Sequence, residues 1–116
     1  GNTAMYIFNR LIKENGYENM MSNQSGNMQV DATMATAGLF AEMLLQSHDG
    51  FIDLLPALPT EWPEGKITGY IIDIEWKNGS LVKAEIKMSK GSIFPVVKVN
   101  GTSISDDDSR IIVKQL

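Results

Sequence analysis

Apolar residues in the first part of the chain recur at the spacing of a helix. They lie on one face of a helix predicted over residues 3–15, and Gly16 follows where a left-handed residue would end that helix. The positions that define this face are Ala4, Phe8, Leu11 and Ile12. Residues 17–30 are mostly polar, which predicts a long connection.

A second helix is predicted over residues 32–47, with Asp31 or Thr33 as the residue that caps its start. Glu42 is the one charged residue between positions 37 and 45, and apolar side chains cover nearly every direction around the axis. Such a helix needs burial on most sides. At ~25 cal/mol per Å² of apolar surface, several uncovered side chains would forfeit a large part of a domain's stability. Either the second part of the chain or helices outside it must cover this helix, and we therefore expect the chain to be a piece of a larger protein.

The second part of the chain alternates apolar and polar residues as strands do. Asn78-Gly79 and Asn100-Gly101 are typical of tight hairpin turns between such strands. The strands are predicted over 70–77, 82–88, 93–99 and 110–114, with Val82, Ala84, Ile86 and Met88 on one apolar face. Residues 51–65 hold three of the four prolines and are predicted to form an extended, rigid connector. Consecutive hairpins predict an antiparallel sheet, half of a two-layer sandwich.

Composition narrows the classes of function. The chain has 116 residues, enough for one modest domain, and its net charge of −4 with scattered basic residues disfavours nucleic-acid binding. It holds no cysteine, so thiolate metal sites and disulfides are excluded. No apolar run approaches the roughly 18–20 residues of a membrane helix, and no signal-peptide pattern opens the chain. A leading Gly1 without Met indicates an artificial or processed N-terminus.

The acidic residues and the single histidine are the candidates for catalytic or metal-binding groups. Asp31 is either a helix cap or a catalytic carboxylate at the edge of a polar loop. His48 follows the second helix, where a cation complements the helix dipole, and it has no neighbouring His or Cys for a metal site. Residues 106–108 are all Asp but lack the Gly and the distant Glu of a calcium loop, which predicts a solvated turn. No metal and no other cofactor is expected.

Aromatic residues raise the question of sugar binding. Tyr70 and Trp76 share the apolar face of one predicted strand, which favours the core. Trp62 lies between prolines and is either an anchor between the connector and the sheet or a ring that stacks on a sugar. Trp62 is therefore the candidate for carbohydrate binding.

Five segments occur in a characteristic order and spacing. They read QVD at 29–31, AEMLLQSH at 41–48, LLPALP at 54–59, WP at 62–63 and DIEWKNG at 73–79. Together they resemble the C-terminal end of glycoside hydrolase family 95, the α-L-fucosidase-like enzymes, over about residues 28–88. In the last strands we recognise no motif.

The resemblance implies an architecture. Residues 1–49 would be the last helices of an (α/α)6 barrel catalytic domain, and residues 50–116 a C-terminal β-domain packed on it. The expected fold class is an α+β fragment, with two helices left from the (α/α)6 barrel followed by an antiparallel β-sandwich-like domain. The apolar second helix would then be a barrel helix without its neighbours.

The resemblance also implies a reaction. The family inverts the anomeric centre, with a general acid that protonates the leaving oxygen and a water that attacks the opposite face. Asp31 matches the Asp of the water-activating group, but residues 32–36 (ATMAT) replace the family's glycine-rich turn, so plain helix is expected there. The general acid and the asparagines that hold the water would lie upstream. We therefore expect the parent enzyme to cleave α-L-fucosides or α-galactosides and this chain alone to be inactive.

Two other functions remain open: a carbohydrate-binding β-module, and a non-catalytic interaction or oligomerisation domain. The expected partners are the upstream catalytic domain of the same chain, the glycan substrate of the parent enzyme, and a second copy through self-association. Neither nucleic acid nor a membrane is expected as a partner. A periplasmic or secreted location is expected by analogy with the family.

Overall fold

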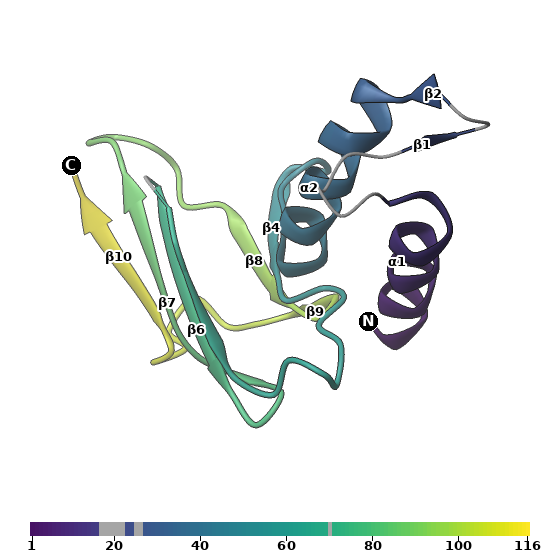
Figure 1. Ribbon diagram of the computed structural model, residues 1–116. Coiled ribbons are helices and arrows are strands. Elements are labelled where there is room, and N and C mark those ends of the chain that lie inside the picture. Colours follow the sequence, from purple (N-terminus) through teal and green to yellow (C-terminus); the bar gives the residue numbers. More distant parts are fainter. Residues whose placement is uncertain (17–22, 25–26, 70) are drawn as a thin grey trace.

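The computed structural model describes residues 1–16, 23–24, 27–69 and 71–116, and these form an α+β structure with the helices in the first part of the chain (Figure 1). The elements are α1 (Asn2–Asn15), β1 (Asn23–Gln24), β2 (Asn27–Met28), α2 (Val30–Leu44), β3 (Leu45–Gln46), β4 (Phe51–Leu54), β5 (Gly65–Thr68), β6 (Ile72–Lys77), β7 (Ser80–Met88), β8 (Val96–Val99), β9 (Thr102–Ser103) and β10 (Ile111–Gln115). Most of the predicted polar connection over 17–30 lies outside the described residues. Within it β1 and β2 pair as a short antiparallel hairpin, which the sequence did not predict.

The helix α1 has the predicted extent, but it does not end as predicted. Gly16 is extended, with φ −90° and ψ 140°, and not left-handed. Its backbone N–H nevertheless donates a hydrogen bond to the Ile12 carbonyl at 2.7 Å. Because this extended conformation already satisfies a carbonyl of the last turn, the helix needs no left-handed residue to end.

The helix α2 differs from its prediction at both ends. It begins at Val30 after Gln29, so Asp31 lies inside the first turn, and no side chain caps the helix. The predicted cap by Asp31 or Thr33 is therefore wrong; the Thr33 hydroxyl donates back to the Gln29 carbonyl at 3.0 Å. At its other end, residues 45–46 form strand β3 where helix was predicted.

The proline-containing connector explains why α2 ends early. The backbone N–H of Leu55 donates to the Leu44 carbonyl at 2.8 Å, and that of Ala57 donates to the Met43 carbonyl at 3.0 Å. These bonds satisfy carbonyls that another helical turn would otherwise use. The chain is thereby released to pair β3 with β4.

One four-stranded sheet has the order β10-β7-β6-β5. The predicted hairpin at Asn78-Gly79 is confirmed: both residues have positive φ, 52° and 70°, and Lys77 pairs with Ser80 across the turn. The prediction of a wholly antiparallel sheet is wrong, because β10 runs parallel to β7. After β7 the chain crosses to the other sheet, where it forms β8 and β9. It then returns to the first sheet as β10, which runs in the same direction as β7.

The other four-stranded sheet has the order β3-β4-β8-β9. Strand β4 lies within the segment predicted as an extended, rigid connector, and it pairs in parallel with β8. The predicted turn at Asn100-Gly101 is confirmed as the link between β8 and β9, with φ of 50° and 75°. Both sheets are thus mixed, and neither is the simple antiparallel sheet that the sequence predicted.

The main core lies between the two sheets. Leu54 of one sheet and Ile74 and Ile86 of the other are among the most deeply buried side chains. Val82 was predicted to face this core but is exposed, because an irregularity in the β6–β7 register pairs Trp76 with Leu81 and turns Leu81 inward. In Figure 1 the β3-β4-β8-β9 sheet lies between the helices and the other sheet.

A smaller core joins the helices to the strands. It consists of Met5, Phe8 and Met43, with Phe40, Leu44 and Trp62 packed against it. The rings of Phe8 and Phe40 meet edge to face, with their centroids 4.2 Å apart. Leu44 also contacts the main core, so the last turn of α2 connects the two cores.

Candidate functional site

Asp31 is exposed in the first turn of α2. An acidic residue there is favoured by the positive end of the helix dipole. Within the part of the chain that the structure describes, its carboxylate makes no hydrogen bond or ion pair. The segment that replaces the family's glycine-rich turn is regular helix, as expected. The catalytic role of Asp31 remains a prediction.

Exposed apolar side chains lie near Asp31 and on both helices. Val30 precedes it and Met34, one turn further along the same side, is 72% exposed. The exposed large apolar residues of the helices are Tyr6, Ile7, Leu11, Ile12, Val30, Met34 and Leu39. Met43 is the buried residue of α2. The strands therefore do not supply the cover that the sequence of the second helix was predicted to need.

Trp62 lies at the junction of the helices and the strands. Its ring stacks on Phe40 of α2, with centroids 5.5 Å apart, and its carbonyl accepts a hydrogen bond from Trp76 Nε1 at 3.0 Å. These contacts describe an anchor between the connector and the sheet. Sugar binding by Trp62 stays a prediction. Tyr70 lies outside the described residues, whereas Trp76 is buried as expected.

His48 and Asp108, one of the three consecutive Asp residues, make side-chain contacts within the chain. His48 is exposed and its Nε2 lies 2.6 Å from Glu42 Oε2. Asp108 binds the Arg110 side chain through two contacts, Oδ1 to Nε at 2.9 Å and Oδ2 to Nη2 at 2.6 Å. The Arg110 side chain holds the pKa of Asp108 at about 2. The three Asp residues thus lie in a turn region, as predicted, and one of their carboxylates is paired with Arg110.

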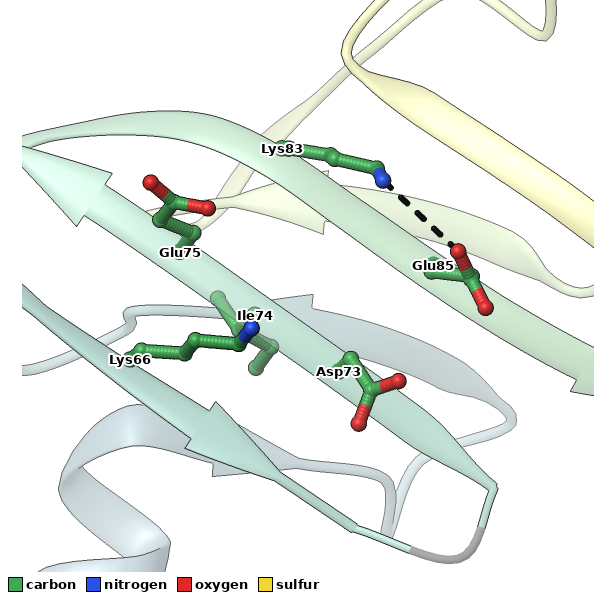
Figure 2. A pocket seen from close by; sticks show the side chains of 6 residues that line it. All are labelled: Lys66, Asp73, Ile74, Glu75, Lys83 and Glu85. Carbon is green, nitrogen blue, oxygen red and sulfur yellow. Dashed lines mark ion pairs between the residues drawn. The ribbon is translucent and has the colours of Figure 1, made fainter.

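The outer face of the β10-β7-β6-β5 sheet carries a charged depression of about 100 Å³ (Figure 2). It is lined by Lys66 of β5, Asp73, Ile74 and Glu75 of β6, and Lys83 and Glu85 of β7. Asp73 and Glu85 lie directly opposite each other in the antiparallel register. Like charges in that position repel. The alternating strand pattern indicates a polar face, but it does not show which charges meet.

Lysines relieve this repulsion. Lys87 Nζ binds Asp73 Oδ2 at 3.2 Å, and Lys114 Nζ binds Glu85 Oε1 at 2.8 Å. The hydrogen bond from Lys87, and then that from the Gly69 backbone, hold the pKa of Asp73 below its ordinary value. The hydrogen bond from Lys114 does the same for the pKa of Glu85. Both carboxylates therefore stay ionised near neutral pH and are unsuited to general-acid catalysis.

Over residues 1–16, 23–24, 27–69 and 71–116, no group of three or more His, Asp or Glu side chains is placed to hold a metal ion. None of the helices in the described ranges is both long and apolar enough to span a bilayer.

The sequence that forms the two sheets identifies a C-terminal domain of a glycoside hydrolase. Residues 46–116 match the C-terminal domain of glycoside hydrolase family 95, and the chain belongs to this family. The matched region comprises both four-stranded sheets except the first residue of β3. The resemblance stated from the five sequence segments is therefore confirmed.

The chain is also similar to a plant protein. It is 36% identical over 77 residues to Alpha-L-fucosidase 2 of Arabidopsis thaliana. The aligned region covers 60% of this chain and 9% of the plant protein. The chain thus spans a small part of the length of the curated relative that it matches.

Proposed function

We propose that this chain is the C-terminal part of a family 95 glycoside hydrolase and that it packs against a helical catalytic domain. The observation that carries this proposal is the apolar surface left uncovered on α1 and α2. These helices directly precede the strands that match the family's C-terminal domain. Neighbouring helices of an (α/α)6 barrel would bury those side chains. The role of the chain is then structural.

The proposal gives Asp31 a place in an inverting site on α-L-fucosides or α-galactosides. Its carboxylate would belong to the group that activates the attacking water. Its exposed position beside Val30 and Met34 supports this, because a domain that covered those side chains would also approach Asp31. The general acid would come from the upstream domain, so the chain alone would not hydrolyse glycosides.

Hydrolysis of aryl α-L-fucosides and aryl α-galactosides tests this assignment. The 116-residue chain should show no turnover, whereas the longer protein should be active. In the longer protein, Asp31→Asn should lower kcat by about 10²-fold or more, the contribution typical of acid–base catalysis. Asp49→Asn, which changes another exposed carboxylate, is the control and should leave kcat unchanged. Turnover by the chain alone that survives Asp31→Asn would contradict the proposal.

The stereochemistry and the location can be measured separately. Proton NMR of the first sugar released should show the inverted anomer, and the retained anomer would exclude the inverting assignment. A periplasmic or secreted location belongs to the same proposal. Fractionation of the source cells would test it, and enzyme found in the cytosolic fraction would contradict it.

A further inference from the structure

A second depression, of about 260 Å³, lies at the end of the sandwich where both Asn-Gly turns are found. Its walls come from the connector, the β6–β7 turn, the β8–β9 turn and the residue that precedes β10. Small-molecule sites typically enclose about 300–1,000 Å³. A volume slightly below that range suits a ligand of the size of one sugar ring.

Part of the lining of this depression is apolar. Leu58 of the connector and Val99 of β8 line it and are half-buried, so each still presents apolar surface. Leu55 and Leu81 also line it and are almost fully buried. Such a surface can accept the C–H face of a ring but gives no specificity alone.

The lining also offers unused polar groups. Ser80, Asn100 and Arg110 line the depression. Within the described part of the chain, the Ser80 hydroxyl and the Asn100 side-chain amide have no hydrogen-bond partner. Arg110 uses Nε and Nη2 for Asp108, which leaves Nη1 as a donor on a guanidinium that is already fixed in place. Hydroxyl and amide groups can both donate and accept, as a polyol requires.

The charge at this site favours a neutral ligand. Arg110 is the charged residue among the described residues that line the depression, and Asp108 neutralises it at 2.6 Å. We propose that the depression binds a neutral saccharide unit, with the ring against Leu58 and Val99 and its hydroxyls on Ser80, Asn100 and Arg110. This site lies on the β-domain and does not include Asp31.

The two Asn-Gly turns supply a matched pair of variants. Asn100 and Asn78 hold the same turn position with nearly equal φ, 50° and 52°, but of the two only Asn100 lines the depression. Glycine adopts positive φ without strain. Asn100→Gly and Asn78→Gly therefore both keep the turn and remove one amide, and equal melting temperatures would show that both variants fold.

The test is a titration of the 15N-labelled 116-residue chain with L-fucose and D-galactose, followed by two-dimensional NMR. Saturable shifts are expected at the amides of Ser80, Leu81, Asn100 and Arg110, with a dissociation constant on the order of 1–10 mM. Asn100→Gly should weaken binding about fivefold, as the loss of one hydrogen bond would. Asn78→Gly should bind as the wild type does.

Three results would overturn the proposal: no saturable shift with either sugar, equal weakening in both variants, or D-glucuronate binding more tightly than the neutral sugars. The last result would identify an anion site on Arg110. None of these results would affect the hydrolysis assays, so this inference and the proposed catalytic role can fail independently.

Discussion

At the scale of the residue, the clearest electrostatic effect is the pair of Asp108 and Arg110. Besides its two side-chain contacts, Asp108 Oδ1 accepts the Arg110 backbone N–H at 3.0 Å. These donors lower the pKa of Asp108 from 3.8 to about 2. A carboxyl whose pKa is depressed on folding stabilises the fold above its unfolded pKa and loses that contribution as the pH falls. The relevant window is therefore about pH 4 down to pH 2.

We expect Asp108→Asn to be less stable than the wild type at pH 7. The difference in the free energy of unfolding should shrink between about pH 4 and pH 2, because the wild-type carboxylate becomes protonated there. Urea unfolding at pH 7 and at pH 2.5 measures both differences. The exposed neighbour provides the control, since Asp106→Asn should change stability little at either pH. An equal deficit of Asp108→Asn at both pH values would contradict this account.

At the scale of the element, the close packing of β5 against β6 depends on a glycine. A Cβ on Gly65 would collide with ring carbons of Trp76. That indole cannot easily move, because it is buried and its Nε1 is bonded to the Trp62 carbonyl. Gly38 presents the opposite case: it is exposed within α2, and a Cβ there would meet nothing within 4 Å.

These two glycines should respond to alanine with opposite signs. Gly65→Ala should destabilise the fold by about 1–3 kcal/mol through overpacking. Gly38→Ala should stabilise it by about 0.5–1 kcal/mol, because alanine loses less backbone entropy in a helix. Thermal or urea unfolding of both variants measures these shifts. If both variants changed the free energy of unfolding in the same direction, packing against Trp76 would not be what governs the effect of Gly65→Ala.

The elements also show how far the sequence predicted this fold. The two hairpin turns were predicted because an Asn-Gly pair encodes positive φ locally. The parallel pairings of β4 with β8 and of β10 with β7 join strands distant in sequence, and no local pattern specifies them. Val82 was misplaced because an irregular register depends on the partner strand. For the site, Asp31 was located by resemblance, whereas the pairing of Asp108 with Arg110 required the structure.

At the scale of the whole molecule, the helices are packed against the strands on one side and are uncovered on the other. Their small core faces the strands, while Tyr6, Met34 and Leu39 remain exposed. Exposed apolar surface on this scale is typical of an interface. The charged outer face of the β10-β7-β6-β5 sheet lies on the far side of the molecule from the helices (Figure 1). An adjoining domain would therefore cover the helices and leave the charged face in solvent.

We expect the isolated chain to self-associate through the helices as its concentration rises. Sedimentation velocity should show growing oligomers, and Met34→Glu with Leu39→Lys should reduce them by placing charges on that surface. Ile93→Ser, which removes an apolar side chain that is 93% exposed in the loop after β7, should leave the association unchanged. If the chain sedimented as a monomer at high concentration, the prediction of self-association would be wrong.

The direct passage from α2 into β3 determines how this domain can be exchanged between enzymes. Similarity to the family's C-terminal domain begins at residue 46, yet the carbonyls of Met43 and Leu44 are bonded to the connector that follows β4. A domain that began at residue 46 would lack these two carbonyls, so the backbone N–H groups of Leu55 and Ala57 would lose their acceptors. It would also lack half of β3. The smallest transplantable unit therefore begins inside α2, and a hybrid enzyme would have to inherit the last turn of that helix together with the strands.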